Sequence, residues 1–303
     1  LEANSSGGSN VAVGADALAS NTTASNNTAV GKSSLAANTT GAYNTAVGAQ
    51  AGDALTEGSQ NIAIGYAALT SDTKGSKSIA IGESALYAQN FTTATDTYNV
   101  AVGENAGMAV TTGTTNTFVG GLAGSVNTTG ASNTAVGMQS LASNTTGNYN
   151  SVLGKYALLY NSTGANNVAV GYSSLFANTT ASNNTAVGVS SLAANTTGDL
   201  NTALGTSALA ENTTGNRNVA VGVLALDANT VGDRNVAVGM GSLGTFNPSS
   251  NADTYNVAVG YEAGASVTTG IQNTLIGGLA GDAITTASNN AAFGYSALGA
   301  NST

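Results

Sequence analysis

The chain has 303 residues, a formal net charge of −9, only 7% charged residues and 40 glycines, and it contains no Cys, His or Trp. Its six Lys and Arg residues are scattered singly, which argues against nucleic acid as a partner because that affinity rests on clustered basic side chains. No apolar run approaches the roughly 18 residues of a membrane-spanning helix, and without cysteine the chain has no disulfide and no thiolate metal site.

One pentapeptide recurs along the whole chain, as in Asn44-Thr45-Ala46-Val47-Gly48, and we call its closing residue the marked glycine. The marked glycines are Gly14, Gly31, Gly48, Gly65, Gly82, Gly103, Gly120, Gly137, Gly154, Gly171, Gly188, Gly205, Gly222, Gly239, Gly260, Gly277 and Gly294. Successive members are 17 residues apart, except for two steps of 21 that begin at Gly82 and Gly239. A short fixed period is typical of solenoids, so we expect residues 1–303 to form one repetitive domain of seventeen coils. Aliphatic residues at fixed intervals also argue against a disordered chain.

Each coil begins with Asn, which is replaced once by Ser78. The next position holds Val, Thr or Ile in most coils, the one after it is usually Ala, and an aliphatic residue then precedes the marked glycine. This run predicts a short strand, and stacked Asn amides can form hydrogen bonds from coil to coil. A small residue and Leu follow, as in Ser140-Leu141, and predict a second short extended segment. An Asn-Thr-Thr-Gly turn such as 144–147 then closes the coil with glycine angles that other residues avoid. The fold class we predict is all-β, a parallel β-solenoid or β-roll.

Glycine replaces the usual Leu in five coils, at Gly52, Gly107, Gly124, Gly264 and Gly281. In four of these coils an apolar residue appears three places later, as Leu55, Val110, Val267 and Ile284. Such compensation within one chain predicts a packed interior.

Both Ala46 and Val47 are small or apolar, as are their equivalents in almost every coil. Successive strand residues point to opposite faces, so this pattern predicts a strand that is covered on both sides. We therefore expect a homo-oligomer, with a trimer favoured and the Ala column turned towards partner chains. The alternative is a tight monomeric coil in which alanine is merely small enough to fit.

The two long coils repeat each other, because Asp96–Gly103 returns as Asp253–Gly260, 157 residues later. We expect a bulge at one corner of each, carrying Phe91 within 87–95, and Phe246 with Pro248 within 245–252. An exposed aromatic residue there could contact a receptor; the alternative is a tolerated surface insertion.

Catalysis is not expected, because His and Cys, the usual general base and nucleophile, are both absent. We assign no catalytic, cofactor-binding or metal-ligating residue, and we expect no cofactor. Glu83 and Glu104 share a column and could hold a cation together, although no third carboxylate accompanies them. A polysaccharide-processing enzyme remains the third class of function, and its candidate acids are Asp53, Glu57 and Asp72.

One corner of the coils carries charged residues of both signs. Asp199 and Asp233 stand in one column beside Arg217 and Arg234. We interpret this group as exposed ion pairing, worth roughly 0 to 1 kcal/mol.

The Asn-Thr-Thr column allows two further hypotheses. Each triplet is an acceptor sequence for N-glycosylation, and the alternative is an uncharged, hydrated corner. Threonine ladders can also bind ice, but these two threonines are adjacent and should point to different sides.

The stretch 61–69, Asn-Ile-Ala-Ile-Gly-Tyr-Ala-Ala-Leu, resembles the head repeats of YadA-like trimeric autotransporter adhesins, and similar longer repeats occur in phage tail fibres and other microbial surface fibres. The resemblance covers residues from about 10 to 303. It implies a left-handed parallel β-roll, three chains side by side, and attachment as the function. The chain departs from that family in its longer step of 17 and in showing no coiled-coil stalk, neck or membrane anchor.

We therefore expect a structural and adhesive shaft or head of a microbial or viral surface fibre, located outside the cell, on its surface or on a virion. Its partners would be copies of itself and a host or surface receptor or glycan. The alternatives are a subunit of a self-assembling extracellular filament and an ice-binding or glycan-binding solenoid. The last residues, Asn301-Ser302-Thr303, stop within a repeat, so we expect a processed chain or a segment of a longer one.

Overall fold

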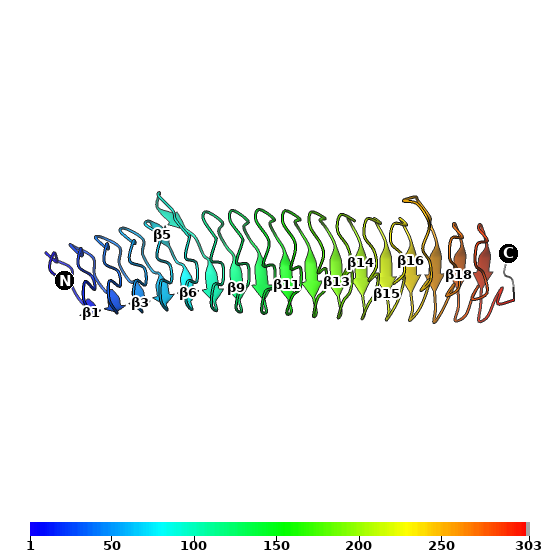
Figure 1. The fold of residues 1–303 in the computed structure, drawn as a ribbon, viewed down its shortest axis with the longest axis horizontal. Coiled ribbons are helices and arrows are strands. Elements are labelled where there is room, and N and C mark those ends of the chain that lie inside the picture. The colour runs from blue at the N-terminus through cyan, green and yellow to red at the C-terminus, as the bar shows by residue number, and fades with distance from the viewer. Residues whose placement is uncertain (301–303) are drawn as a thin grey trace. The chain divides into compact units, whose positions relative to one another are not determined.

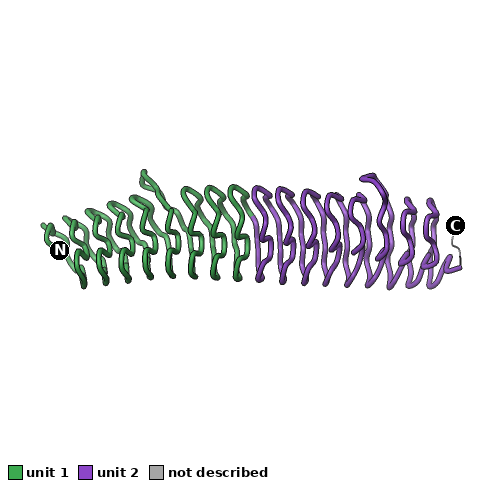
Figure 2. Tube along the Cα trace, viewed as in Figure 1, with its two compact units in different colours: residues 1–149 green, residues 150–303 purple. Residues whose placement is uncertain are grey.

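A computed structural model describes residues 1–300; Asn301, Ser302 and Thr303, where the unfinished repeat was noted, lie outside the described residues. The protein is all-β, a parallel β-solenoid of about seventeen coils, with no helix among residues 1–300. No helix within that range is therefore long and apolar enough to cross a membrane. The chain divides into two compact units, residues 1–149 and 150–303 (Figure 2).

Each coil of unit 1 contributes one strand to a parallel sheet (Figure 1), and the first long coil adds a two-stranded pair. The sheet strands, in spatial order, are β1 (Val11–Val13), β2 (Thr28–Val30), β3 (Thr45–Val47), β4 (Ile62–Ile64), β6 (Ile79–Ile81), β8 (Val100–Val102), β9 (Thr117–Val119) and β10 (Thr134–Val136). The additional parallel pair is β5 (Gly75–Ser76) with β7 (Thr95–Asp96).

Unit 2 repeats the same arrangement with nine strands in chain order. They are β11 (Ser151–Leu153), β12 (Val168–Val170), β13 (Thr185–Val187), β14 (Thr202–Leu204), β15 (Val219–Val221), β16 (Val236–Val238), β17 (Val257–Val259), β18 (Thr274–Ile276) and β19 (Ala291–Phe293). The predicted strands and their parallel stacking are thus confirmed in both units.

The register of the sheet equals the sequence repeat, so that Ala186 of β13 pairs with Ala203 of β14. The middle residue of each strand points into the coil, and in these two strands it is fully buried. Its neighbours Thr185 and Val187 point outward and are half-buried. The expectation that the Ala column faces partner chains was wrong: alanine is the only one of the three residues that lies against the interior of the coil, and the aliphatic residue after it faces out.

The predicted second extended segment is also wrong. The residues after each marked glycine form a compact turn, in which Ser190 and Leu192 take left-handed angles, with φ of 54° and 49°. A left-handed conformation is costly for Leu, about 1–3 kcal/mol. The turn holds because the Leu192 side chain is fully buried and its amide donates to Ala208 of the next coil at 3.0 Å.

The marked glycines lie directly above one another. Gly205 has φ of 136°, and a Cβ added to it would stand 2.6 Å from the carbonyl oxygen of Gly222 in the next coil. Glycine is therefore required by both backbone angle and contact distance. The glycine of the Asn-Thr-Thr-Gly turn differs, because Gly215 has no left-handed φ; a Cβ there would meet the carbonyl oxygen of Gly232 at 2.6 Å.

Two columns of buried asparagine connect the coils, and stacked amides were predicted for the first of them. The first Asn column stands four residues before each marked glycine; Asn184 there accepts the backbone N–H of Asn201, and its own amide donates to the carbonyl of Gly198 at 2.9 Å. The second Asn column opens each Asn-Thr-Thr triplet, and Asn195 in it donates to the same carbonyl at 3.0 Å. The buried amides thus find partners within and between coils. An exception is the side-chain oxygen of Asn38, which has no hydrogen-bond partner because the next coil holds Leu55 in this column.

The predicted compensation is confirmed, because Leu55, Val110, Val267 and Ile284 are fully buried in the position that the second Asn column otherwise occupies. In the remaining coil of the five, which contains Gly124, the space left by the missing Leu is filled differently. Phe118 stands there in place of the inward alanine, and its ring fills the space into which a Cβ on Gly124 would project.

Candidate functional sites

The outward strand face is the first surface with functional potential; we define it as the first and third residues of the sheet strands of each unit. All of these residues are Thr, Ser, Ala, Val, Ile, Leu or Phe, and none is charged. All are half-buried or exposed, with Leu153 at 52% and Leu204 at 48% exposure. Each unit therefore presents an uncharged, largely aliphatic sheet face to its surroundings.

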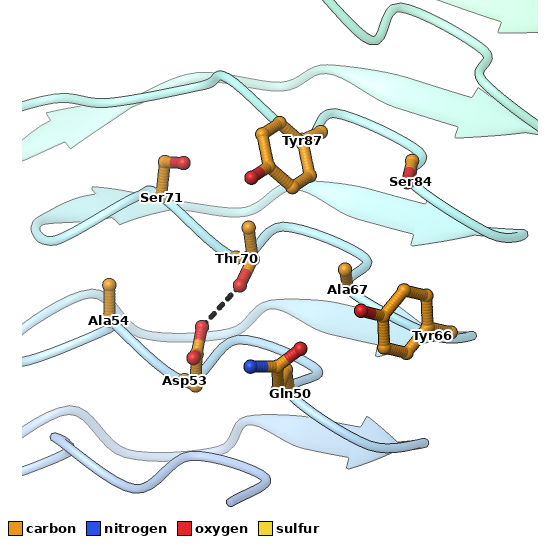
Figure 3. Close-up of a pocket in the computed structure, with 9 residues that line it drawn as sticks. All are labelled: Gln50, Asp53, Ala54, Tyr66, Ala67, Thr70, Ser71, Ser84 and Tyr87. Carbon is orange, nitrogen blue, oxygen red and sulfur yellow. Dashed lines mark hydrogen bonds between the residues drawn. The ribbon is translucent and has the colours of Figure 1, made fainter.

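A hollow in unit 1, the Asp53 groove, has a volume of about 480 Å³ (Figure 3). Its lining residues are Gln50, Asp53, Ala54, Tyr66, Ala67, Thr70, Ser71, Ser84 and Tyr87. They come from three consecutive coils, and the Thr70 hydroxyl donates to the Asp53 carboxylate inside the groove. Of the three acids considered for catalysis, Asp53 lines this groove, and Glu57 and Asp72 do not.

The sequence marks this groove by a departure from the repeat. Five residues after the marked glycine, the two preceding coils carry Ala19 and Ala36, and the coil that follows the groove carries Met108. Asp53, Thr70 and Tyr87 occupy the same column in three successive coils. This run of polar and aromatic residues in one column is the signal of the groove that our interpretation of the sequence did not use.

Asp72 occupies the second Asn column and is fully buried. Its carboxylate accepts hydrogen bonds from the backbone N–H groups of Gly75 and Phe91, at 3.1 and 3.0 Å, and from the side chain of Gln89 at 2.6 Å. Burial raises the pKa of this carboxyl above its usual value of 3.8, although the hydrogen bonds act in the opposite direction. In most coils the residue at this position is Asn, whose amide donates to the Asn of the preceding coil. The preceding coil here holds Leu55, which has no acceptor, so a carboxylate that needs no acceptor suits the position. These contacts give Asp72 a structural role within the coil.

The third acid, Glu57, forms an exposed ion pair with Lys74 at 2.9 Å. Glu83 and Glu104 are exposed, and Glu104 accepts a hydrogen bond from the side chain of Asn105 at 3.4 Å. Within residues 1–300, no group of three or more His, Cys, Asp or Glu residues could hold a metal ion.

The long coils do bulge at one corner (Figure 1), but their aromatic residues are not exposed. Phe246 is fully buried and Phe91 is only 7% exposed, and Pro248 is buried beside Phe246. The expectation of exposed aromatic contacts was therefore wrong. The extra length lets each ring turn back into the coil, where burial of its apolar surface anchors the bulge.

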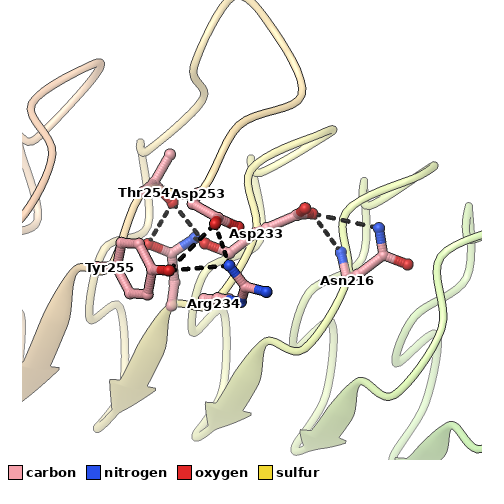
Figure 4. Close-up of polar contacts among 7 residues, drawn as sticks. Asn216, Asp233, Arg234, Asp253, Thr254 and Tyr255 are labelled. Atoms are coloured by element: carbon pink, nitrogen blue, oxygen red, sulfur yellow. Dashed lines mark hydrogen bonds and ion pairs between the residues drawn. The ribbon is translucent and has the colours of Figure 1, made fainter.

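The segment that recurs 157 residues later forms the same surface contacts in both units. In unit 2, Arg234 pairs with Asp253 and donates to the Tyr255 hydroxyl at 2.9 Å (Figure 4). In unit 1, Lys77 makes the equivalent ion pair with Asp96 at 2.5 Å and reaches the Tyr98 hydroxyl at 3.1 Å. Each cation also lies against its tyrosine ring, 5.1 Å away for Lys77 and 5.5 Å for Arg234. Both groups cross the base of a bulge.

The ion pairs expected at Asp199 and Asp233 do not form. Asp199 accepts the backbone N–H of Ser182, and Asp233 accepts that of Asn216, both at 2.6 Å. Within the part of the chain that the structure describes, no ion pair joins Arg217 to either acid, and Arg234 pairs with Asp253 of the next coil instead. These aspartates act as hydrogen-bond acceptors for turns because the backbone N–H groups point at them.

The Asn-Thr-Thr triplets do not present glycosylation acceptors in the folded chain. Asn195 is fully buried with its amide donating to two acceptors, so a sugar on that nitrogen would disrupt the column. The two threonines point in different directions, as predicted. The hydroxyl of Thr196 donates to Thr213 of the next coil at 3.0 Å, and Thr197 is exposed.

No protein-family model matches the chain, and no curated protein matches it in sequence.

Proposed function

We propose that this chain is a structural and adhesive segment, shaft or head, of an extracellular microbial or viral surface fibre, in which three copies pack through their outward strand faces. It mediates attachment and carries out no catalysis. The observation that supports this proposal is the outward strand face, which stays free of charge through every coil of both units. Extended apolar surfaces of this kind mark protein interfaces.

The interior of the coils explains why such a surface is not needed for folding. The core is supplied by inward Ala and Leu residues and by the two Asn columns, all contained within the coil. An exposed Val or Ile in a strand of this kind adds nothing to that core. Threonine or another polar residue would serve solubility better at the third strand position, yet all its occupants are Val, Ile, Leu or Phe. Packing against other copies accounts for this preference, and the resemblance to trimeric adhesins favours three copies.

The test is the solution mass of the chain, measured by light scattering across a dilution series. We expect a mass of three chains that does not change with concentration. The double variant Val170→Asp/Val187→Asp places charge on the outward strand face and should give a single-chain mass. Thr180→Asp, at an exposed corner residue of the same part of unit 2, is the matched control and should leave the trimer intact.

Two results would overturn the trimer. A single-chain mass for the unaltered chain would mean that the outward strand face is exposed to water. Growth without limit would instead support the filament subunit, because unpaired strand edges can template further chains.

Attachment itself is measured by coating beads with the chain and recording how many a cell monolayer retains under flow, with uncoated beads for comparison. Equal retention of both would contradict the adhesive role.

A further inference from the structure

We propose that the Asp53 groove is a binding site for an uncharged saccharide. The proposal rests on the proposed attachment function for its biological role, whereas the binding itself can be measured separately. The volume of about 480 Å³ lies within the range of roughly 300–1,000 Å³ that is usual for small-ligand sites.

Two tyrosine rings provide the apolar part of the site. Tyr66 and Tyr87 come from adjacent coils and line the groove together (Figure 3), with exposures of 55% and 44%. Exposed phenol rings combine a flat apolar face with a hydroxyl group. A sugar ring presents the matching surface, since its C–H groups form an apolar face and its hydroxyls lie at the edge.

The polar groups of the groove suit a ligand that both donates and accepts hydrogen bonds. Asp53 has two carboxylate oxygens, of which Thr70 occupies one, so acceptor capacity remains for ligand hydroxyls. The amide of Gln50 and the hydroxyls of Ser71 and Ser84 can each donate and accept. This mixture is what a polyhydroxylated ligand requires.

The charge of the groove disfavours acidic ligands. Asp53 is its only charged lining residue, and no Lys or Arg lines it. A sulfate, phosphate or uronate group would therefore meet a carboxylate with no cation to offset the repulsion. The groove therefore favours a neutral sugar, N-acetylated sugars included, over an acidic one.

The repeat provides an internal comparison for the choice of this groove. Tyr172 in unit 2 stands in the same column as Tyr66, directly after a marked glycine, but the column that holds Asp53 carries Leu159 and Phe176 beside it. Aromatic exposure alone thus recurs along the chain, whereas the combination of two rings with a carboxylate and hydroxyls is found where three consecutive coils depart from the repeat.

The test is titration of the full chain with glucose, galactose, mannose, N-acetylglucosamine and their short oligomers, followed by saturation-transfer NMR, with glucuronate as the anionic control. We expect saturable binding of at least one neutral sugar and none of glucuronate. Tyr66→Ala, Tyr87→Ala and Asp53→Asn should each weaken binding roughly fivefold or more, as the loss of a ring contact or hydrogen bond predicts. Tyr172→Ala should leave it unchanged. Circular dichroism establishes that every variant is folded.

Absence of saturable binding for all neutral sugars would overturn the proposal, and so would equal binding by the unaltered chain and Tyr87→Ala. A soluble sugar and a surface glycan share this chemistry, so the same sugar is then offered both free and immobilised on beads.

Retention of the chain on the sugar-coated beads supports attachment. A chain that binds sugar but has a single-chain mass retains the site and loses the trimeric fibre, whereas a trimer that binds no sugar retains the fibre and loses the site.

Discussion

The side-chain amide of Asn195 donates a hydrogen bond to the side-chain oxygen of Asn178 in the preceding coil, at 3.0 Å. The same amide donates to the carbonyl of Gly198 in its own coil, and its oxygen accepts from Asn212 in the next coil at 2.8 Å. One side chain therefore links three successive coils. The contacts run along the direction in which the coils stack, so the column contributes to stability at each coil.

Replacement of Asn195 by Ala should lower the free energy of unfolding by about 1–3 kcal/mol, because Asn178, Asn212 and Gly198 would each lose a buried partner. The measurement is chemical denaturation followed by circular dichroism. Thr197→Ala, at an exposed position two residues away, should change stability by less than about 0.5 kcal/mol. Equal effects of the two substitutions would show that the column does not stabilise the coils.

The stacked glycines give a second prediction. Gly205→Ala should strongly destabilise its coil, because the new Cβ would lie 2.6 Å from the carbonyl oxygen of Gly222. The backbone φ of 136° is also a conformation that alanine rarely adopts. Native-state hydrogen exchange of the Gly222 and Leu224 amides, which donate to Leu204 and Thr206, should then become much faster.

The control for this substitution is Gly121→Ala. Gly121 has no left-handed φ, and a Cβ there would meet nothing within 4 Å. Its replacement should leave exchange unchanged. Slow exchange retained in Gly205→Ala would mean that the coils can move apart at little cost.

Much of this fold could be predicted from the sequence, because each coil repeats the same residue pattern and the same local structure. The 17-residue period predicted the coils, the strand at Thr185–Val187 and the stacked amides of the first Asn column. The Asn of each Asn-Thr-Thr triplet was expected at a hydrated or glycosylated corner, but Asn195 is buried. The period could not show which of Ala186 and Val187 faces inward, because both are apolar and the inward choice depends on how small the space inside the coil is. It also could not show that Leu192 takes a left-handed angle, since leucine rarely does so and the cost is met by burial.

The candidate sites were harder to predict, because they depend on which side chains meet across coils. The bulges were located correctly, yet Phe246 folds inward, since a free aromatic ring gains more from the coil interior than from water. The acids of the corner column looked like partners for Arg217, but Asp199 is taken by the backbone N–H of Ser182. The Asp53 groove combines side chains from three coils, and its unusual column forms a hollow only where those coils stack.

The bulge of unit 2 should depend on its buried ring far more than on its ion pair. Phe246→Ala should reduce stability by about 3–5 kcal/mol, as is usual for a large buried aromatic residue. Arg234→Ala removes a partly exposed ion pair with Asp253 and should cost no more than about 1 kcal/mol. Limited proteolysis within 247–253 and denaturation midpoints measure the two effects. A larger loss with Arg234→Ala than with Phe246→Ala would show that the surface contacts hold the bulge.

The buried carboxyl of Asp72 predicts a pH dependence whose sign follows from its raised pKa. Because the folded chain holds this proton more tightly than the unfolded chain, the contribution to stability is fully present below the unfolded pKa of 3.8 and is lost as the pH rises through the folded value. The difference in unfolding free energy between the unaltered chain and Asp72→Asn should therefore shrink or reverse as the pH rises from 3 to 7, because asparagine has no proton to release. Denaturation at several pH values measures this difference, and Glu57→Gln, in an exposed ion pair with Lys74, is the control. If the unaltered chain gained stability relative to Asp72→Asn as the pH rose, the carboxylate would be favoured by its hydrogen bonds with Gln89 and the backbone, and desolvation would not be the dominant effect.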